Sequence, residues 1–171
     1  GAMVEDSALG LFRAASRGAE LAMIAQGLAF TILGPILSRT LALENRDEAQ
    51  SLISQSAVLS SFLGLSICAI LAAFPGTYLG LFGVGFREAT PILLILVATQ
   101  MISILCGPAA LILIMHRREK LVLFTALAGL GLNLGLKVML IPGLGTIGAA
   151  LATFAAVAVV KVALLALVIR E

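Results

Sequence analysis

The sequence has 171 residues, of which 61% are hydrophobic and 12% are charged, and its formal net charge is +2. Soluble domains carry about a quarter charged residues, so a chain this apolar is not expected to stay dispersed in water. The small net charge and the 5% aromatic content argue against a nucleic-acid partner. We therefore predict an all-α integral membrane protein, a polytopic bundle of about five transmembrane helices.

A transmembrane helix needs about 20 predominantly apolar residues to cross the hydrocarbon core. In chain order, the predicted helices cover residues 10–38, 54–74, 89–115, 120–141 and 146–169. Pro75-Gly76 should end the second helix and Pro142-Gly143 the fourth, because proline removes a backbone donor and glycine permits a turn. The connections are short, so consecutive helices should run antiparallel.

The reactive side chains give little support for catalysis or for a metal site. Cys68 and Cys106 both lie in apolar stretches, so we interpret them as small side chains of separate helices, not as a disulfide. His116 is the only histidine and has no cluster of cysteines or carboxylates near it. We therefore expect no enzymatic activity, no metal and no cofactor.

Basic residues near the helix ends predict the orientation, because Lys and Arg are retained on the cytoplasmic side. The connections after the first and third helices, with the C-terminal tail, hold Arg39, Arg46, Arg117, Arg118, Lys120 and Arg170. The opposite side holds Arg13, Arg17 and Arg87. This balance predicts a cytoplasmic C-terminus and an N-terminal segment on the outer side.

The first helix carries charges on one face. Arg13, Arg17 and Glu20 follow at spacings of four and three, so they share that face, and Arg17 can pair with Glu20. One interpretation is that the arginines anchor the helix end to lipid phosphates. The other is that they recognise a phosphate inside the bundle, for which the forked donors of guanidinium are well suited.

A polar stripe also follows the fourth predicted helix. Its members recur every four residues and stack along one face: Thr125, Gly129, Asn133 and Lys137. A cation at the centre of a membrane helix costs about 2.5–3.5 kcal/mol, so Lys137 is not expected to face lipid. The stripe is either a packing seam between helices or the wall of a hydrated cavity.

Two further features of the apolar helices leave alternatives open. Lys161 shares a face with Ala150, Thr153 and Val157, and it either extends toward the membrane interface or lies behind the cavity. Pro108 should loosen the backbone ladder of the third helix, which predicts either a static kink or a hinge.

Four segments resemble motifs of bacterial polysaccharide flippases, in the same order along the chain. Residues 1–17 resemble the passage after the seventh helix, with its Val/Leu-Gly-x-Tyr/Phe-x-x-Ala pattern, and residues 34–39 resemble the Pro-containing end of the eighth. Residues 81–86 are similar to the Phe-Gly-x-x-Phe/Tyr turn before the tenth helix, and residues 140–153 to the Ile-Pro-x-x-Gly-x-x-Gly-Ala-Ala segment entering the twelfth. The family is the Wzx-type, oligosaccharidyl-lipid branch of the MOP (MATE-like) exporter superfamily.

The resemblance implies that residues 1–171 form a C-terminal-lobe fragment, helices 8–12 of a twelve-helix flippase whose first seven helices are missing. Gly1-Ala2-Met3 also matches the remnant left after tag removal, so the start has two explanations. Intact members move undecaprenyl-diphosphate-linked oligosaccharide, an O-antigen (lipopolysaccharide) or exopolysaccharide repeat unit, across the bacterial inner membrane by alternating access.

The partners that this implies are the lipid-linked oligosaccharide, membrane lipids, the missing N-terminal lobe and the polymerase and export machinery of polysaccharide assembly. The candidate substrate-binding residues rest on their polarity inside the membrane and not on a family motif: Arg13, Arg17, Asn133, Lys137 and Lys161. Two alternatives stay open. One is a multidrug or peptidoglycan-precursor exporter of the same superfamily, and the other is a membrane scaffold that transports nothing.

Overall fold

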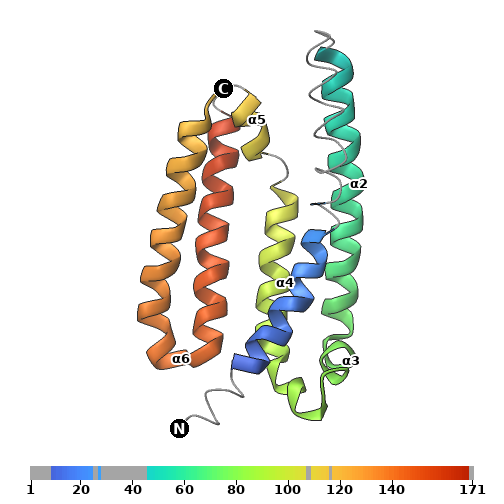
Figure 1. Ribbon diagram of the computed structural model, residues 1–171, viewed down its shortest axis with the longest axis vertical. Helices are drawn as coiled ribbons and strands as arrows, with labels where there is room; N and C mark the ends of the chain where they lie inside the picture. The colour runs from blue at the N-terminus through green and yellow to red at the C-terminus, as the bar shows by residue number, and fades with distance from the viewer. Residues whose placement is uncertain (1–8, 25–26, 28–45, 107–108, 116, 170–171) are drawn as a thin grey trace.

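The computed structural model describes residues 9–24, 27, 46–106, 109–115 and 117–169, and every regular element in these ranges is helical (Figure 1). A first helical segment covers residues 9–24. It is followed by α2 (Arg46–Ala73), α3 (Pro75–Gly80), the 3₁₀ helix η1 (Val84–Ala89), α4 (Thr90–Leu105), α5 (Ala109–Met115) and α6 (Glu119–Ile169). The predicted all-α membrane bundle is confirmed: three described stretches are long and apolar enough to span a membrane, namely Ser54–Ala73, Gly85–Leu105 and Glu119–Ile169.

The last stretch, α6, is a hairpin of two antiparallel arms (Figure 1). These arms correspond to the predicted helices 120–141 and 146–169. The predicted stop at Pro142-Gly143 is wrong, because Pro142 lies inside the helix and the chain reverses at Gly145, with φ 57° and ψ −134°. A proline removes only its own bond to the preceding turn, whereas a reversal through positive φ requires glycine.

Two glycines fix the register of this hairpin. A Cβ atom at Gly148 would lie 2.5 Å from the carbonyl oxygen of Leu140, and one at Gly129 would overlap the side chain of Val160. Both contacts fit one antiparallel register, in which Asn133 is level with the Ala156 region of the second arm. The backbones can approach this closely because neither glycine has a side chain, as is usual where membrane helices pack.

The core of the bundle lies where helix 9–24, α2, α3 and α4 meet, and it is built on small residues. Helix 9–24 contributes buried alanines to this core: Ala14, Ala15, Ala19 and Ala22. A Cβ atom at Gly18 would lie 2.7 Å from Cε1 of Tyr78 and 3.0 Å from Cδ1 of Leu93. One at Gly64 of α2 would lie 3.3 Å from the carbonyl oxygen of Ala22. Small side chains thus let helix 9–24 pack closely against α2, Tyr78 and Leu93.

Three predicted helix boundaries need correction or fall outside the described residues. The helix expected at 89–115 is interrupted, since α4 ends at Leu105 and α5 begins at Ala109. Cys106 is the C-cap of α4, and residues 107–108, with the kink or hinge expected at Pro108, lie outside the described residues. The helix expected at 54–74 begins earlier, at Arg46, because residues 46–53 are polar but still favourable for a helix. Of the helix expected at 10–38, residues 25–26 and 28–38 lie outside the described residues, as does the motif at 34–39.

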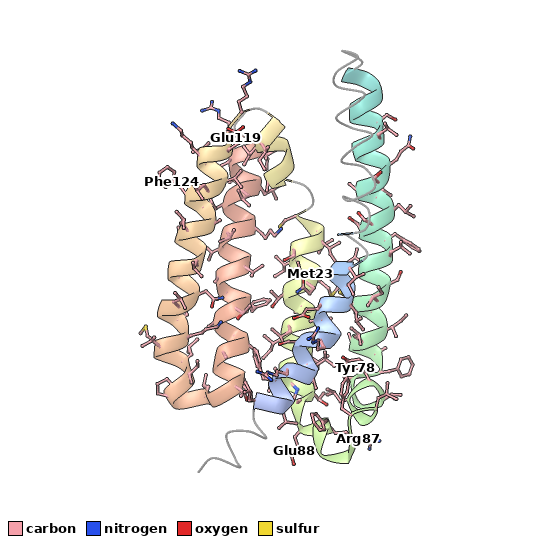
Figure 2. The ribbon with its side chains drawn as sticks, viewed as in Figure 1. Met23, Tyr78, Arg87, Glu88, Glu119 and Phe124 are labelled. Atoms are coloured by element: carbon pink, nitrogen blue, oxygen red, sulfur yellow. The ribbon has the colours of Figure 1, made fainter. Side chains whose placement is uncertain are left out.

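Charged side chains gather at two opposite ends of the bundle. Figure 2 shows Arg87 and Glu88 near Tyr78 at one end, and Glu119 at the other. The turn of α6 lies at the same end as α3, and the start of α2 lies at the same end as α5 (Figure 1). This grouping agrees with the predicted arrangement of the connections, while the side that faces the cytoplasm stays a prediction.

The hairpin packing leads to a matched pair of substitutions. Gly129→Val should destabilise the bundle by about 1–3 kcal/mol, because its side chain must displace Val160. Gly131→Val is the control, since Gly131 is exposed on the same arm and a Cβ atom there meets nothing within 4 Å. The measurement is the thermal unfolding midpoint in detergent micelles. Equal midpoints for the two variants would show that the arms do not pack as described.

Candidate functional site

Helix 9–24 has two chemically distinct faces. Its packed face consists of the buried alanines and Gly18, which recur every three or four residues. The opposite face is exposed and carries Arg13, Arg17 and Glu20. The periodicity of the helix separates the two sets, because residues three and four apart lie on one side. The structure therefore confirms that the three charged residues share a face and shows that this face points away from the bundle core.

The predicted ion pair on this face is present but weak. Nη1 of Arg17 lies 3.9 Å from Oε2 of Glu20, and the two side chains are 80% and 57% exposed. An exposed pair at this separation contributes little to stability because both groups are well solvated. The guanidinium of Arg17 therefore keeps most of its donors available for another ligand.

An aromatic group holds this helix at the end of the bundle. The hydroxyl of Tyr78 donates a hydrogen bond to the carbonyl oxygen of Ala14 over 3.2 Å. The ring of Tyr78 stacks edge-on against Phe82 at 5.4 Å between centroids, and Phe82 lies 6.0 Å from Phe86. Aromatic rings with a polar tip are enriched at the membrane interface. We therefore expect Arg13, one residue before Ala14, to lie at interfacial depth, and Arg17 to lie about one turn deeper.

Two electrostatic effects act on Tyr78. Burial disfavours its charged form and raises the pKa of the phenol above its ordinary value, and the negative charge of Glu20 raises this pKa further. The sequence analysis did not predict a role for Tyr78. The spacing of four residues between Tyr78, Phe82 and Phe86, in a segment rich in glycine, would have indicated an aromatic cluster.

The polar stripe of α6 packs against the other arm at its centre. Gly129 is buried against Val160, and the Thr125 hydroxyl donates to the carbonyl oxygen of Leu121 over 2.7 Å. Asn133 and Lys137 share the face of Gly129 and are half-buried. The register places them level with buried small residues of the second arm, Ala156 and Ala152. The packing of Gly129 favours the interpretation of the stripe as a seam between the arms.

Lys161 belongs to a third environment. Ala150, on the same face of the second arm, packs into the core with α4, and Leu164 packs against Ala109 of α5. Lys161 lies between these positions on that face and is half-buried. It therefore lies between the levels of α4 and α5, toward the C-terminal end of α4. A cation is electrostatically favourable near a helix C-terminus.

The five candidate residues thus do not form one site in the structure. Arg13 and Arg17 share the outward face of helix 9–24, Asn133 and Lys137 lie on the seam of α6, and Lys161 lies between the levels of α4 and α5. Within the described ranges, no group of three or more His, Cys, Asp or Glu side chains could hold a metal ion. Cys68 is buried in α2 and Cys106 is half-buried at the end of α4, both as free thiols, and His116 lies outside the described residues.

The raised pKa of Tyr78 predicts a pH dependence of stability. The native protein should keep the phenol proton to a higher pH than the unfolded chain does, so the free energy of unfolding should fall as the pH rises from about 10 through the native pKa. Tyr78 is the only tyrosine, so tyrosinate absorbance reports its titration directly. The variant Tyr78→Phe should lack this component of the pH dependence and should lose about 1 kcal/mol from the missing hydrogen bond. A phenol that titrates at its ordinary pKa in the native protein would contradict this description.

Comparison of the chain with models of known protein families, with curated proteins and with solved structures finds no match. The resemblance of its motifs to Wzx-type flippases therefore stays a prediction from the sequence. What the structure establishes is an all-α bundle, with three described helices long and apolar enough to span a membrane and an exposed charged face on its first helix.

Proposed function

We propose that this chain is the C-terminal-lobe part of a membrane transporter, and not an enzyme. In this proposal the complete protein flips undecaprenyl-diphosphate-linked oligosaccharide across the bacterial inner membrane by alternating access, with its C-terminus in the cytoplasm. Two lines of argument support it. The ordered motifs resemble those of polysaccharide flippases, and the described helices are compatible with a membrane protein.

The exposed charged face of helix 9–24 carries the proposal. The other face of this helix is already used in packing, so Arg13 and Arg17 are left for a ligand or for another protein element. Charged side chains at membrane depth are costly unless they meet water, a counter-charge or protein. A guanidinium binds phosphate oxygens through two parallel donors, so a lipid-linked diphosphate is a chemically suitable ligand.

In the proposed transporter, the missing N-terminal lobe faces this charged surface across a hydrated cavity. The two lobes then rock about the ligand, which is the usual arrangement in transporters built from two halves. The phosphate-anchoring alternative uses the same chemistry at the lipid interface, since Arg17 is only about one turn from interfacial depth. Substrate binding and lipid anchoring differ in one outcome: only substrate binding predicts that the substrate protects this face from a reagent in water.

The scaffold alternative is favoured by a different observation, the packing of Gly129 against Val160. If Asn133 and Lys137 only pack between the two arms, they do not line a cavity, and the substrate-contacting residues are those of helix 9–24 alone.

The exporter alternative requires membrane carboxylates that couple transport to a cation gradient. In helix 9–24 the carboxylate is Glu20, which faces Arg17 at 3.9 Å.

A protection experiment tests the proposal while leaving both arginines in place. In the full-length protein with Cys68 and Cys106 replaced by alanine, Leu21→Cys introduces a thiol one turn from Arg17 on the exposed side of the helix. A membrane-impermeant maleimide should label this thiol, and lipid-linked oligosaccharide should slow the labelling. Leu81→Cys, at the exposed turn after α3, is the control that should label with or without substrate.

Adding Arg17→Gln to the Leu21→Cys protein should abolish the substrate protection without preventing the labelling, because the phosphate loses its bidentate donor. Arg17→Lys should restore protection only in part. Protection that persists in Arg17→Gln, or labelling that the substrate never slows, would refute the proposed role of this face. A thiol at Asn133 that labels as fast as the one at Leu21 would show that the α6 stripe is hydrated after all.

A further inference from the structure

The connection between α5 and α6 is a tight corner with defined hydrogen bonds. The amide of Arg118 donates to the carbonyl oxygen of Leu113, and the amide of Arg117 donates to that of Ile114, each over 2.9 Å. This pair of bonds is the Schellman motif, which closes a helix by turning the chain through a left-handed residue. The amides of Leu121 and Val122 then donate to the carbonyl of Arg118 as α6 begins. The corner therefore fixes the positions of the basic residues that it contains.

Arg117 is an unusual residue for the left-handed position. Its φ is 57°, and it is the only non-glycine residue with positive φ in the described part of the chain. Glycine commonly fills this position because any Cβ atom there crowds the following carbonyl group. The sequence uses seventeen glycines, so the strained arginine points to a benefit from the side chain itself. Unlike glycine, arginine places a positive charge at this position.

The corner carries an excess of positive charge at one end of the bundle. Arg117, Arg118 and Lys120 are all exposed, and Glu119 is the acidic residue among them. The exposed side chains of Arg117 and Lys120 lie at the two ends of this four-residue segment. They lie at the boundary of the membrane-spanning stretch that begins at Glu119, which is the depth at which lipid phosphates lie.

An apolar strip runs from this charge along the first arm of α6. Phe124 and Leu127 follow Lys120 at spacings of four and three, so the three share one face. Phe124 is 67% exposed and Leu127 is 54% exposed. Figure 2 shows Phe124 below Glu119 on the outer side of the arm. A molecule lying on this face would meet the cation of Lys120 at its head, beside the corner that carries Arg117, and an aromatic and an aliphatic side chain along its length.

We propose that the α5–α6 corner is a binding site for an anionic phospholipid, with the phosphate held by Arg117 and Lys120 and an acyl chain lying along Phe124 and Leu127. The occupant is a lipid and not free phosphate, because the cations and the exposed apolar strip are continuous. The site lies at the end of the bundle opposite to the aromatic group around Tyr78. It is therefore separate from the charged face of helix 9–24, and it does not depend on the proposed transport activity.

The test measures lipid retention by the purified chain in detergent micelles, using native mass spectrometry with dioleoylphosphatidylglycerol or dioleoylphosphatidylcholine. The wild-type chain should retain phosphatidylglycerol in preference to phosphatidylcholine. Removing one cation near a charged membrane surface weakens attraction by about 1 kcal/mol, so Arg117→Gly and Lys120→Gln should each reduce phosphatidylglycerol binding about fivefold. Arg87→Gln, at the opposite end, is the control and should leave this binding unchanged.

The variant Arg117→Gly separates binding from folding. Glycine suits the left-handed position, so this variant should unfold at the same temperature as the wild type or at a higher one. Loss of phosphatidylglycerol with an undiminished unfolding temperature supports the site. Unchanged retention in both Arg117→Gly and Lys120→Gln, equal retention of the two lipids by the wild type, or displacement of the lipid by millimolar inorganic phosphate alone would overturn the proposal.

Discussion

The structure depends on one constraint, which is that hydrocarbon offers no hydrogen-bond partner to a backbone amide or carbonyl. An α-helix satisfies these groups within a single segment, and this is why so apolar a chain forms helices throughout its described ranges. The same constraint explains where the helices stop. The α2 helix ends at Ala73, two residues before Pro75, and the α6 hairpin reverses at a glycine that tolerates positive φ. The α5–α6 corner pairs its amides with the preceding turn.

Packing between these helices cannot rely on the hydrophobic effect, because lipid tails are as apolar as leucine. Close approach of backbones takes its place. Glycines and alanines form the contact surfaces of helix 9–24 and α2, and Gly129 and Gly148 do the same between the arms of α6. Large apolar side chains lie both inside and outside the bundle: Leu79, Leu93 and Ile104 are fully buried, whereas Phe62 and Val138 are well exposed. The bundle therefore combines close backbone approach through small residues with a core of buried leucine and isoleucine side chains.

The packing decides which polar residues stay exposed and which lie between helices. Helix 9–24 packs through alanines, so its arginines face outward and remain open to a phosphate-bearing ligand. The α6 stripe packs through Gly129, so Asn133 and Lys137 lie on the seam side of their arm. Lys161 lies on the second arm of α6, between the levels of α4 and α5. Residues of one chemical type thus serve three different environments.

The sequence by itself determined the fold class, because composition and the length of the apolar stretches report directly on the solvent that the chain requires. It also determined which residues share a helix face, since the helical period is local, and it located the end of α2 before Pro75-Gly76. Only the tertiary structure decided that α6 reverses at Gly145 and not at Pro142-Gly143. It also decided which face of each helix is packed. Those choices depend on contacts between residues far apart in sequence, such as Gly129 with Val160 and Ala14 with Tyr78, and no local pattern records them.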